Sequence, residues 1–223
     1  MHHWPLTALT LTTPDLVLRL PSDSELDALA QVTADGVVPD GAVYFPQPWA
    51  TAPPAERARN VVQNHWWARG DWTQDNWRLL LAVFRNDQVI GQQNLSARNF
   101  ATTGEARTGF WLSRRFQGQG YGTQMRAAAL TLAFDGLEAS RVTSTAFTDN
   151  AASRAISRKF GYQPNGIHRI AVDGRSYDTH EDVIGAARWR DHSRTTQVEI
   201  NGLSRCITHF SSDVPYGHSG GVR

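Results

Sequence analysis

Apolar and polar positions along this chain alternate between two periods, one typical of strands and the other of amphipathic helices. Strand-like runs of apolar or alternating residues occupy 16–20, 77–84, 89–100, 106–113 and 141–147. Residues 85–88 have a turn composition, so we expect the second and third runs to form an antiparallel hairpin. The segment 166–185 contains two further strands on either side of a turn at Asp173 and Gly174.

Two helices are expected in the first third of the chain. The first begins at a cap, which is Ser22 or Asp23, and continues as an amphipathic segment. The second spans 53–72 and opens with prolines, which are well tolerated in a first helical turn. Residues 37–54 between them are rich in proline and show little periodicity, so we expect a loop there.

Two later helices follow strand-like runs. The third helix runs from about Tyr121 to Phe134, and the fourth spans 150–162. The buried face of the third helix is expected to contain Tyr121, Met125, Ala128, Ala129 and Leu132. The fourth helix has Asp149 or Asn150 as its N-cap and Gly161 at its C-terminal end.

The order of these elements predicts a mixed α/β fold. A length of 223 residues favours one domain, which we assign to 1–187, with a C-terminal extension at 188–223. In the extension, Asn201 and Gly202 separate two strand-like runs and predict a hairpin, while the last dozen residues are expected to form a flexible tail. This hairpin has three possible roles, which the sequence leaves open. It completes the sheet, covers a binding site, or exchanges with a second subunit of a homodimer.

Composition narrows the class of protein. The chain has 22 basic and 21 acidic side chains, so no global field attracts nucleic acid or an anionic membrane. Cys206 is the single cysteine and lacks zinc-like Cys/His spacing, which favours a reducing compartment and no metal site. The sequence shows no signal-peptide pattern and no apolar run of about 20 residues, so we expect a cytoplasmic protein without a membrane span.

Three glycines in five residues, Gly118, Gly120 and Gly122, join the run at 106–113 to the third helix. The free N–H groups at a helix N-terminus attract phosphate, and glycines allow close approach. Alternatively, the glycines only relieve strain at a strand-to-helix turn. Two nucleotide motifs do not fit, because the Gly-Lys pair of a Walker loop is absent and Thr123 stands where the dinucleotide fingerprint requires glycine.

Two motifs resemble those of the GNAT superfamily, the acyl-coenzyme A dependent N-acyltransferases. The family's Q/R-x-x-G-x-G/A pyrophosphate loop is similar to Gln117-Gly118-Gln119-Gly120-Tyr121-Gly122. The family's asparagine-to-Gly-Phe helix is similar to the pattern of Asn150, Ser153, Ile156, Lys159, Gly161 and Tyr162. Both motifs are most similar to the subgroup that includes the ribosomal-protein N-terminal acetyltransferases and many small-molecule amine acetyltransferases. The resemblance covers about 16–187 and implies a mixed, largely antiparallel sheet with helices on both faces.

The resemblance implies acetyl-CoA or another acyl-CoA as donor, direct attack by an amine, and no metal. Backbone N–H groups of the loop would cradle the pyrophosphate, and the preceding strand would splay from its neighbour. Backbone groups of Trp111 and Leu112 would then bind the pantetheine arm and polarise the thioester. The expected donor-binding residues are Trp111, Leu112, Gln117, Gly118, Gln119, Gly120, Tyr121, Gly122, Thr123, Asn150 and Ser153.

Transfer to an amine needs a base, because an alkyl amine with a pKa near ~10.4 is protonated at neutral pH. Glu105 is the candidate, although related sequences often carry a glutamate at the position of Arg107. Either Glu105 acts through water or the base lies elsewhere, in which case Glu105 is a solvated turn residue. Many relatives protonate the leaving thiolate with a tyrosine at the position of Ser157. Ser153, which matches a serine common in the subgroup, is the candidate here; otherwise it bonds backbone at the helix start.

The resemblance places the acceptor beside the first two helices and the last strands. The aromatic residues expected to line its pocket are Tyr44, Phe45, Trp66, Trp67, Trp72 and Tyr177. His168 and His180 are treated as surface or hydrogen-bonded residues. The acceptor is a small-molecule or peptide amine that the sequence does not identify. A donor thioester held on an acyl carrier protein and an acyl-CoA-binding module without turnover remain as alternatives.

Overall fold

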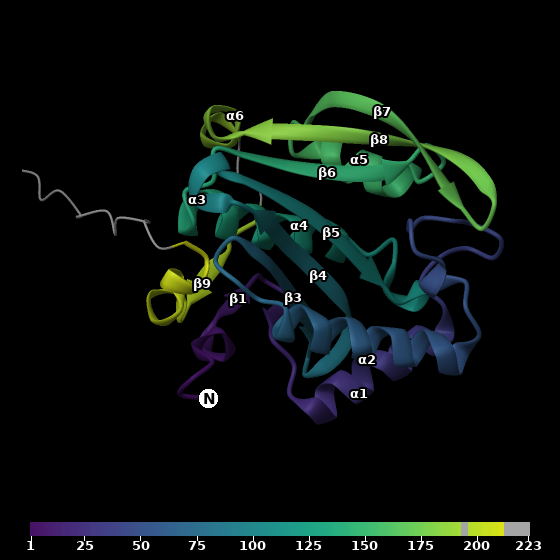
Figure 1. The fold of residues 1–223 in the computed structure, drawn as a ribbon, viewed down its shortest axis with the longest axis horizontal. Helices are drawn as coiled ribbons and strands as arrows, with labels where there is room; N and C mark the ends of the chain where they lie inside the picture. The colour runs from purple at the N-terminus through teal and green to yellow at the C-terminus, as the bar shows by residue number, and fades with distance from the viewer. Residues whose placement is uncertain (193–195, 212–223) are drawn as a thin grey trace, which may run out of the picture.

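A sheet of nine strands runs through the described part of the molecule, and helices pack on both of its faces (Figure 1). The computed structural model describes residues 1–192 and 196–211. The strand order is β7-β8-β6-β5-β4-β3-β2-β1-β9. The strands are β1 (Thr10–Thr12), β2 (Val17–Arg19), β3 (Asn76–Arg85), β4 (Gln88–Arg98), β5 (Glu105–Leu112), β6 (Arg141–Phe147), β7 (Gln163–Val172), β8 (Arg175–Gly185) and β9 (Glu199–Asn201). The helices are α1 (Asp23–Val32), α2 (Pro54–Gly70), α3 (Phe100–Thr103), α4 (Tyr121–Thr131), α5 (Ala151–Lys159) and α6 (Ala186–Asp191).

Local signals in the sequence place the first helix and the central hairpin where they were expected. Ser22 caps α1 by accepting from the Glu25 N–H, and the Glu25 carboxylate accepts from the Ser22 N–H at 2.8 Å. This reciprocal pair satisfies two backbone donors that a helix start leaves free. Asn86 and Asp87 take positive φ values of 46° and 62°, which suits the two-residue turn between β3 and β4.

The two faces of the sheet bury two separate apolar clusters. Along β3, Leu79, Leu81 and Val83 join the larger cluster, whereas Ala82 and Phe84 join the smaller one. Successive side chains of a strand point to opposite faces, so a strand buried on both sides contributes to both clusters. Figure 1 shows α1 and α2 together on the face of the smaller cluster, with α4 and α5 on the other face.

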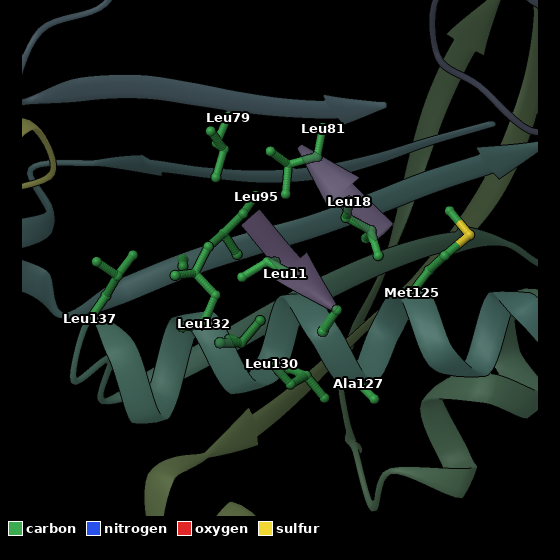
Figure 2. Close-up of a cluster of buried hydrophobic side chains, with 14 of the residues drawn as sticks. Leu11, Leu18, Leu79, Leu81, Leu95, Met125, Ala127, Leu130, Leu132 and Leu137 are labelled. Atoms are coloured by element: carbon green, nitrogen blue, oxygen red, sulfur yellow. The ribbon is translucent and has the colours of Figure 1, made fainter. Parts of the chain in front are cut away.

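Helix α4 packs its apolar side against the leucines of four strands. Figure 2 shows Met125 of this helix and Leu132 at its end on the side that faces a group of side chains from the sheet. That group contains Leu11, Leu18, Leu79, Leu81 and Leu95. The face expected from the sequence is buried at all five positions, Tyr121, Met125, Ala128, Ala129 and Leu132. The helix then widens into a π-helical turn at Leu132–Gly136, which the sequence pattern did not predict.

Strands β5 and β6 run parallel but stay paired for only part of their length. Their register ends with Thr108 opposite Ser144. Beyond that point β5 continues to pair with β4, and β6 continues to pair with β8. The two strands therefore diverge toward the glycine loop, as the expected splay requires.

The C-terminal extension does not form the hairpin predicted at Asn201 and Gly202. β9 instead pairs with β1 at the sheet edge, and the chain continues through two short 3-10 turns at Leu203–Arg205 and Ile207–His209. Gly202 has φ +77°, and a Cβ there would lie 2.0 Å from the Ala8 carbonyl oxygen, so the turn packs against the chain's beginning. The turn predicted at Gly202 is present. The segment after it packs against the rest of the protein instead of pairing with the strand before it.

The segment after β9 is part of the main core. Cys206 and Phe210 are fully buried, and the indole Nε1 of Trp77 donates to the Phe210 carbonyl at 3.1 Å. This extension therefore completes the sheet and the core instead of standing apart from them. The expected flexible tail, 212–223, lies outside the described residues. No helix within 1–192 and 196–211 combines the length and apolar character needed to cross a bilayer.

Candidate active site

A cavity of about 910 Å³ opens where β5 and β6 separate. Its walls come from the glycine loop, the diverging strand ends, the first turn of α5, the loop between α1 and α2, and parts of β7 and β8. Phe110 and Trp111 both line it, yet Phe110 packs against the α4 cluster and Trp111 belongs to the α1–α2 cluster. The cavity is therefore lined from both faces of the sheet.

The glycine loop offers a row of backbone donors to this cavity. Gly118 and Gly120 have φ values of +74° and +85°, and a Cβ at either position would meet nothing within 4 Å. Glycine is needed there for backbone conformation, and the adjoining space is open. The Gln117 N–H bonds to Arg114 and the Thr123 N–H to Gly120, whereas the N–H groups of 118–122 have no acceptor among the described residues. Consecutive free amides at a helix start form a suitable nest for a phosphate group.

The side chains of Gln117 and Gln119 hold the loop in place. The Gln117 Nε2 donates to the Val37 and Leu112 carbonyls at 3.1 and 2.9 Å, and the Gln119 Nε2 donates to the Arg115 carbonyl. Tyr121 is buried in the main core. Of the seven loop residues named from the sequence, Gln119 and Tyr121 do not line the cavity. These two could contribute only backbone N–H groups to a ligand.

The start of α5 forms another part of the cavity wall. The Asn150 Oδ1 accepts from the Ser153 N–H at 3.1 Å, so Asn150 is the N-cap of this helix. Asn150 and Ser153 both line the cavity. Ser157, one turn further along, is buried and does not line it. The cap uses only the acceptor of the Asn150 side chain, so its amide N–H groups remain available to a ligand.

Glu105, the expected base, is not brought to the cavity. Its carboxylate accepts a hydrogen bond of 2.7 Å from the Arg141 Nε at the paired end of β5 and β6. The cavity lies toward the other end of β5, beyond the last paired residues. The sequence placed Glu105 on the correct strand but did not indicate which end of that strand opens.

Two carboxylates do line the cavity, Asp149 beside the start of α5 and Glu181 on β8. The Glu181 Oε2 lies 3.1 Å from the Arg107 Nη2, and its Oε1 accepts from the Asn165 Nδ2 at 2.7 Å. The Glu181 side chain is 16% exposed, whereas that of Arg107 is 59% exposed. Sequence reasoning missed Glu181. The available signal was Arg107 itself, because a cation on the wall of a site calls for an acidic partner on a neighbouring strand.

Residues 15–163, about two thirds of the chain, match the family model described as "Acetyltransferase (GNAT) domain". The chain belongs to the GNAT family. This finding confirms the resemblance inferred from the glycine loop and the α5 motif. In this GNAT chain the loop and the divergence of β5 from β6 together form the cavity.

Several named proteins resemble this GNAT chain. "Putative ribosomal N-acetyltransferase YdaF" of Bacillus subtilis (strain 168) is 33% identical over 76 residues, which cover 33% of this chain and 42% of that protein. Mycobacterium smegmatis RimJ, solved in complex with CoA-disulfide, is 19% identical with a TM-score of 0.63, covering 93% of this chain and 97% of RimJ. RimL, a ribosomal L7/L12 alpha-N-protein acetyltransferase solved with coenzyme A, is 22% identical with a TM-score of 0.58, covering 77% of this chain and 94% of RimL. The match with YdaF thus spans less than half of that protein, and the two structures show a shared fold.

Some of the aromatic residues expected to line the acceptor pocket lie at the cavity, and others lie elsewhere. Tyr44 and Phe45 line the cavity, and burial, followed by the nearby Asp149 charge, raises the pKa of the Tyr44 phenol. Trp66 and Trp67 are 57% and 61% exposed on α2 and do not line the cavity, because the opposite side of that helix faces the core. Tyr177 stays outside the lining as well.

Two further aromatic residues pack elsewhere. The Tyr177 ring packs edge-on against Phe147 with centroids 5.7 Å apart. Trp72 stacks on Trp77 and donates from its Nε1 to the His209 carbonyl. His168 lines the cavity, whereas His180 does not. Of the six aromatic residues that the sequence suggested for the acceptor pocket, Tyr44 and Phe45 are the two that line the cavity.

A chain of buried polar groups reaches the cavity from α2. The His65 Nε2 lies 2.7 Å from the Gln92 Oε1, and the Gln92 Nε2 donates to the Asn94 Oδ1 at 2.6 Å. Burial lowers the pKa of His65 to about 4, so the ring is neutral at pH 7 and donates from Nε2 to the amide oxygen. Asn94 lines the cavity, and its Oδ1 is already bonded, so its Nδ2 is the group left for a ligand.

No cluster of three or more His, Cys, Asp or Glu side chains suited to a metal ion occurs within 1–192 and 196–211. The groups that line the cavity include backbone amides, hydroxyls and side-chain amides, together with the Arg107–Glu181 pair and a second cation, Arg126. These groups suit the binding of an anion on one side and of a polar or cationic group on the other.

Proposed function

We propose that this GNAT protein transfers an acetyl or another acyl group from a coenzyme A thioester to an amine of a peptide or a small molecule. The observation that carries the proposal is the cavity lined from both faces of the sheet, with free amides at one end and a carboxylate at the other. The names of the relatives make the N-terminal amine of a protein the first acceptor to test.

The donor would be held mainly by the backbone. The N–H groups of 118–122 and the Thr123 hydroxyl would bind the diphosphate, and charge-assisted bonds of this kind are stronger than neutral ones. The Asn150 amide and the unpaired backbone of β5 beyond Thr108 would bind the amide-bearing arm between the diphosphate and the thioester. When bound, the coenzyme supplies an acyl group activated as a thioester.

The amine side of the cavity would be served by Glu181. A primary alkyl amine is protonated at neutral pH and must lose that proton before its nitrogen can attack. Glu181 is an ionisable carboxylate on the wall, held by Arg107 and Asn165, and would accept the proton directly or through one water. Glu105 is ion-paired with Arg141 away from the cavity. We therefore assign the role of base to Glu181 instead of Glu105.

The thiol side would be served by Ser153. As the amine nitrogen forms its bond to the carbonyl carbon, the carbon–sulfur bond breaks and its electron pair leaves with the sulfur. Ser153 lines the cavity, and its hydroxyl would relay a proton to that sulfur, taking up one from water as it gives up its own, while Glu181 takes the proton released by the amine. One proton is thus gained by the thiol for each proton lost by the amine.

Two assays test this proposal. Calorimetry should detect binding of coenzyme A, and a screen of peptides and small amines with acetyl-CoA should show thiol release together with an acetylated product by mass spectrometry. Ser153→Ala should lower turnover by about 100-fold or more while coenzyme A binding stays within a few-fold. Binding without transfer to any amine would identify a binding module, and transfer only from an acylated carrier protein would identify a carrier-dependent enzyme.

A further inference from the structure

Arg126 is a buried cation that has no carboxylate partner in the part of the chain that the structure describes. It lies in the second turn of α4, is only 1% exposed, and yet lines the cavity. Its Nε and one terminal nitrogen, Nη1, have no hydrogen-bond partner among the described residues. The guanidinium carbon instead lies 5.5 Å from the ring centre of Phe110 and 5.4 Å from that of Tyr162.

The fold keeps Arg126 in this place at a cost in free energy. Burying an ion is unfavourable unless it is paired, and the two aromatic faces compensate for only part of the lost hydration. An uncharged side chain such as methionine would fill the same space without that penalty. A cation retained at a cavity wall therefore indicates that the ligand brings negative charge to this point.

The position of Arg126 indicates which group of the ligand carries this negative charge. One helical turn earlier, a Cβ on Gly122 would lie 3.0 Å from Ile156 and 3.3 Å from Phe110, so this side of α4 faces both. Phe110 lies just beyond the last paired residues of β5 and β6. Arg126 therefore lies between the amide loop, which suits a diphosphate, and the point of divergence, where the thioester would be held.

We propose that Arg126 stabilises the negative charge that develops on the coenzyme A sulfur as the acyl group is transferred. This inference rests on the proposed function. The arm between diphosphate and thioester is uncharged, so negative charge appears in that stretch only during transfer. It develops on the carbonyl oxygen, which backbone groups of β5 would stabilise, and then on the departing sulfur. A guanidinium does not lose its proton in proteins, so Arg126 acts as a fixed charge. The electron pair of the broken carbon–sulfur bond stays on sulfur beside this charge until a proton arrives from Ser153.

The titration of bound coenzyme A tests the proposal without an acceptor. The complex of the reduced protein with coenzyme A is followed by the ultraviolet absorbance of the thiolate as pH rises. A cation close to the sulfur should lower the pKa of the bound thiol by about one unit or more relative to free coenzyme A. Burial raises the pKa of Cys206, the single cysteine, to about 11, so the protein's own thiol does not interfere in that range.

Two variants separate charge from shape. Arg126→Met should fold and bind coenzyme A, but its bound thiol should titrate like the free thiol. Arg126→Lys, which keeps the charge, should retain part of the shift. An unshifted thiol in the wild-type complex, or the same shift in Arg126→Met, would overturn the inference and leave the proposed function intact. Absence of coenzyme A binding by the wild-type protein would overturn the proposed function, and this inference with it. If Arg126→Met does not fold, the wild-type and Arg126→Lys titrations still decide.

Discussion

The Nη2 of Arg107 on β5 lies 3.1 Å from the Oε2 of Glu181 on β8, so a salt bridge crosses over β6 at the cavity wall. The more buried partner is the carboxylate, which Asn165 also holds from β7. Two strands that are distant in the sequence thus fix one carboxylate at the cavity wall. We propose this carboxylate as the base, a role for which the sequence offered only Glu105.

Replacing Glu181 with glutamine should remove that base while keeping its shape. We expect Glu181→Gln to lower kcat by about 100-fold or more, the usual range for loss of a general base, with coenzyme A affinity unchanged. The matched control is Glu105→Gln, which breaks the Arg141 contact away from the cavity and should leave kcat within about twofold. The measurement is thiol release with acetyl-CoA and an active acceptor.

The same pair of variants can be compared with an acceptor that is already neutral at the assay pH, such as methoxyamine. Because no proton has to be removed before attack, the defect of Glu181→Gln should shrink with this acceptor. Equal defects with both acceptors, or a larger loss in Glu105→Gln than in Glu181→Gln, would rule out Glu181 as the base.

Alanine at Gly118 or Gly120 should weaken coenzyme A binding. Both glycines have positive φ, and an L-residue there costs about 1–2 kcal/mol, which favours a loop rearrangement that turns amides away from the ligand. Losing one charge-assisted bond corresponds to about 1.5–3 kcal/mol, so calorimetry should show Kd raised at least about tenfold.

The control for the glycine loop is Gly174→Ala in the β7–β8 turn. Gly174 has φ +72° and equally open surroundings, but it does not line the cavity. The Gly174→Ala variant should lose about as much stability as the loop variants but keep normal affinity for coenzyme A. Equal loss of affinity in the loop and control variants would mean that general destabilisation, not the amide nest, controls binding.

His65 should make stability depend on pH in a defined window. Burial lowers its pKa from 6.5 to about 4, so between these values the unfolded chain binds a proton that the folded chain does not. Stability should therefore be complete above about pH 6.5 and decrease as pH falls toward 4, by roughly 3 kcal/mol in total. Urea unfolding at several pH values measures this slope.

The matched variant is His65→Gln, whose side-chain amide can still donate to Gln92 but does not titrate. It should unfold with a smaller dependence on pH across the same window. If the wild-type slope persists unchanged in His65→Gln, the dependence belongs to other groups.

Phe210→Ala tests whether the C-terminal extension is part of the core. The Phe210 ring is fully buried, with its centre 5.0 Å from that of Trp77 and 5.5 Å from that of Trp72. Removing it should lower the free energy of unfolding by about 3–5 kcal/mol. Arg205→Ala, an exposed change in the same segment, should cost less than about 0.5 kcal/mol. A small effect at Phe210 would mean that this segment stabilises the fold little.

Local chemistry explains which elements were predictable. Ser22 with Glu25, the Asn86–Asp87 turn and the spacing of Met125 with Leu132 are short-range signals, and each element they predicted is present. The prediction of a hairpin at Asn201 and Gly202 was wrong, because β9 pairs with the edge strand β1, which is far away in the sequence. Short strands such as β1 carry too few alternating residues to be recognised alone.

The sequence alone determined the family, the α/β class, the glycine loop and the capped helix that carries Ser153, since each depends on residues close together in the chain. Only the tertiary structure decided which charged and polar groups meet in the cavity. Glu181, Arg126 and Asn94 come from different elements, and the divergence of β5 from β6 places them around one space. Side-chain chemistry can be read from the chain, but which end of a strand opens depends on long-range pairing.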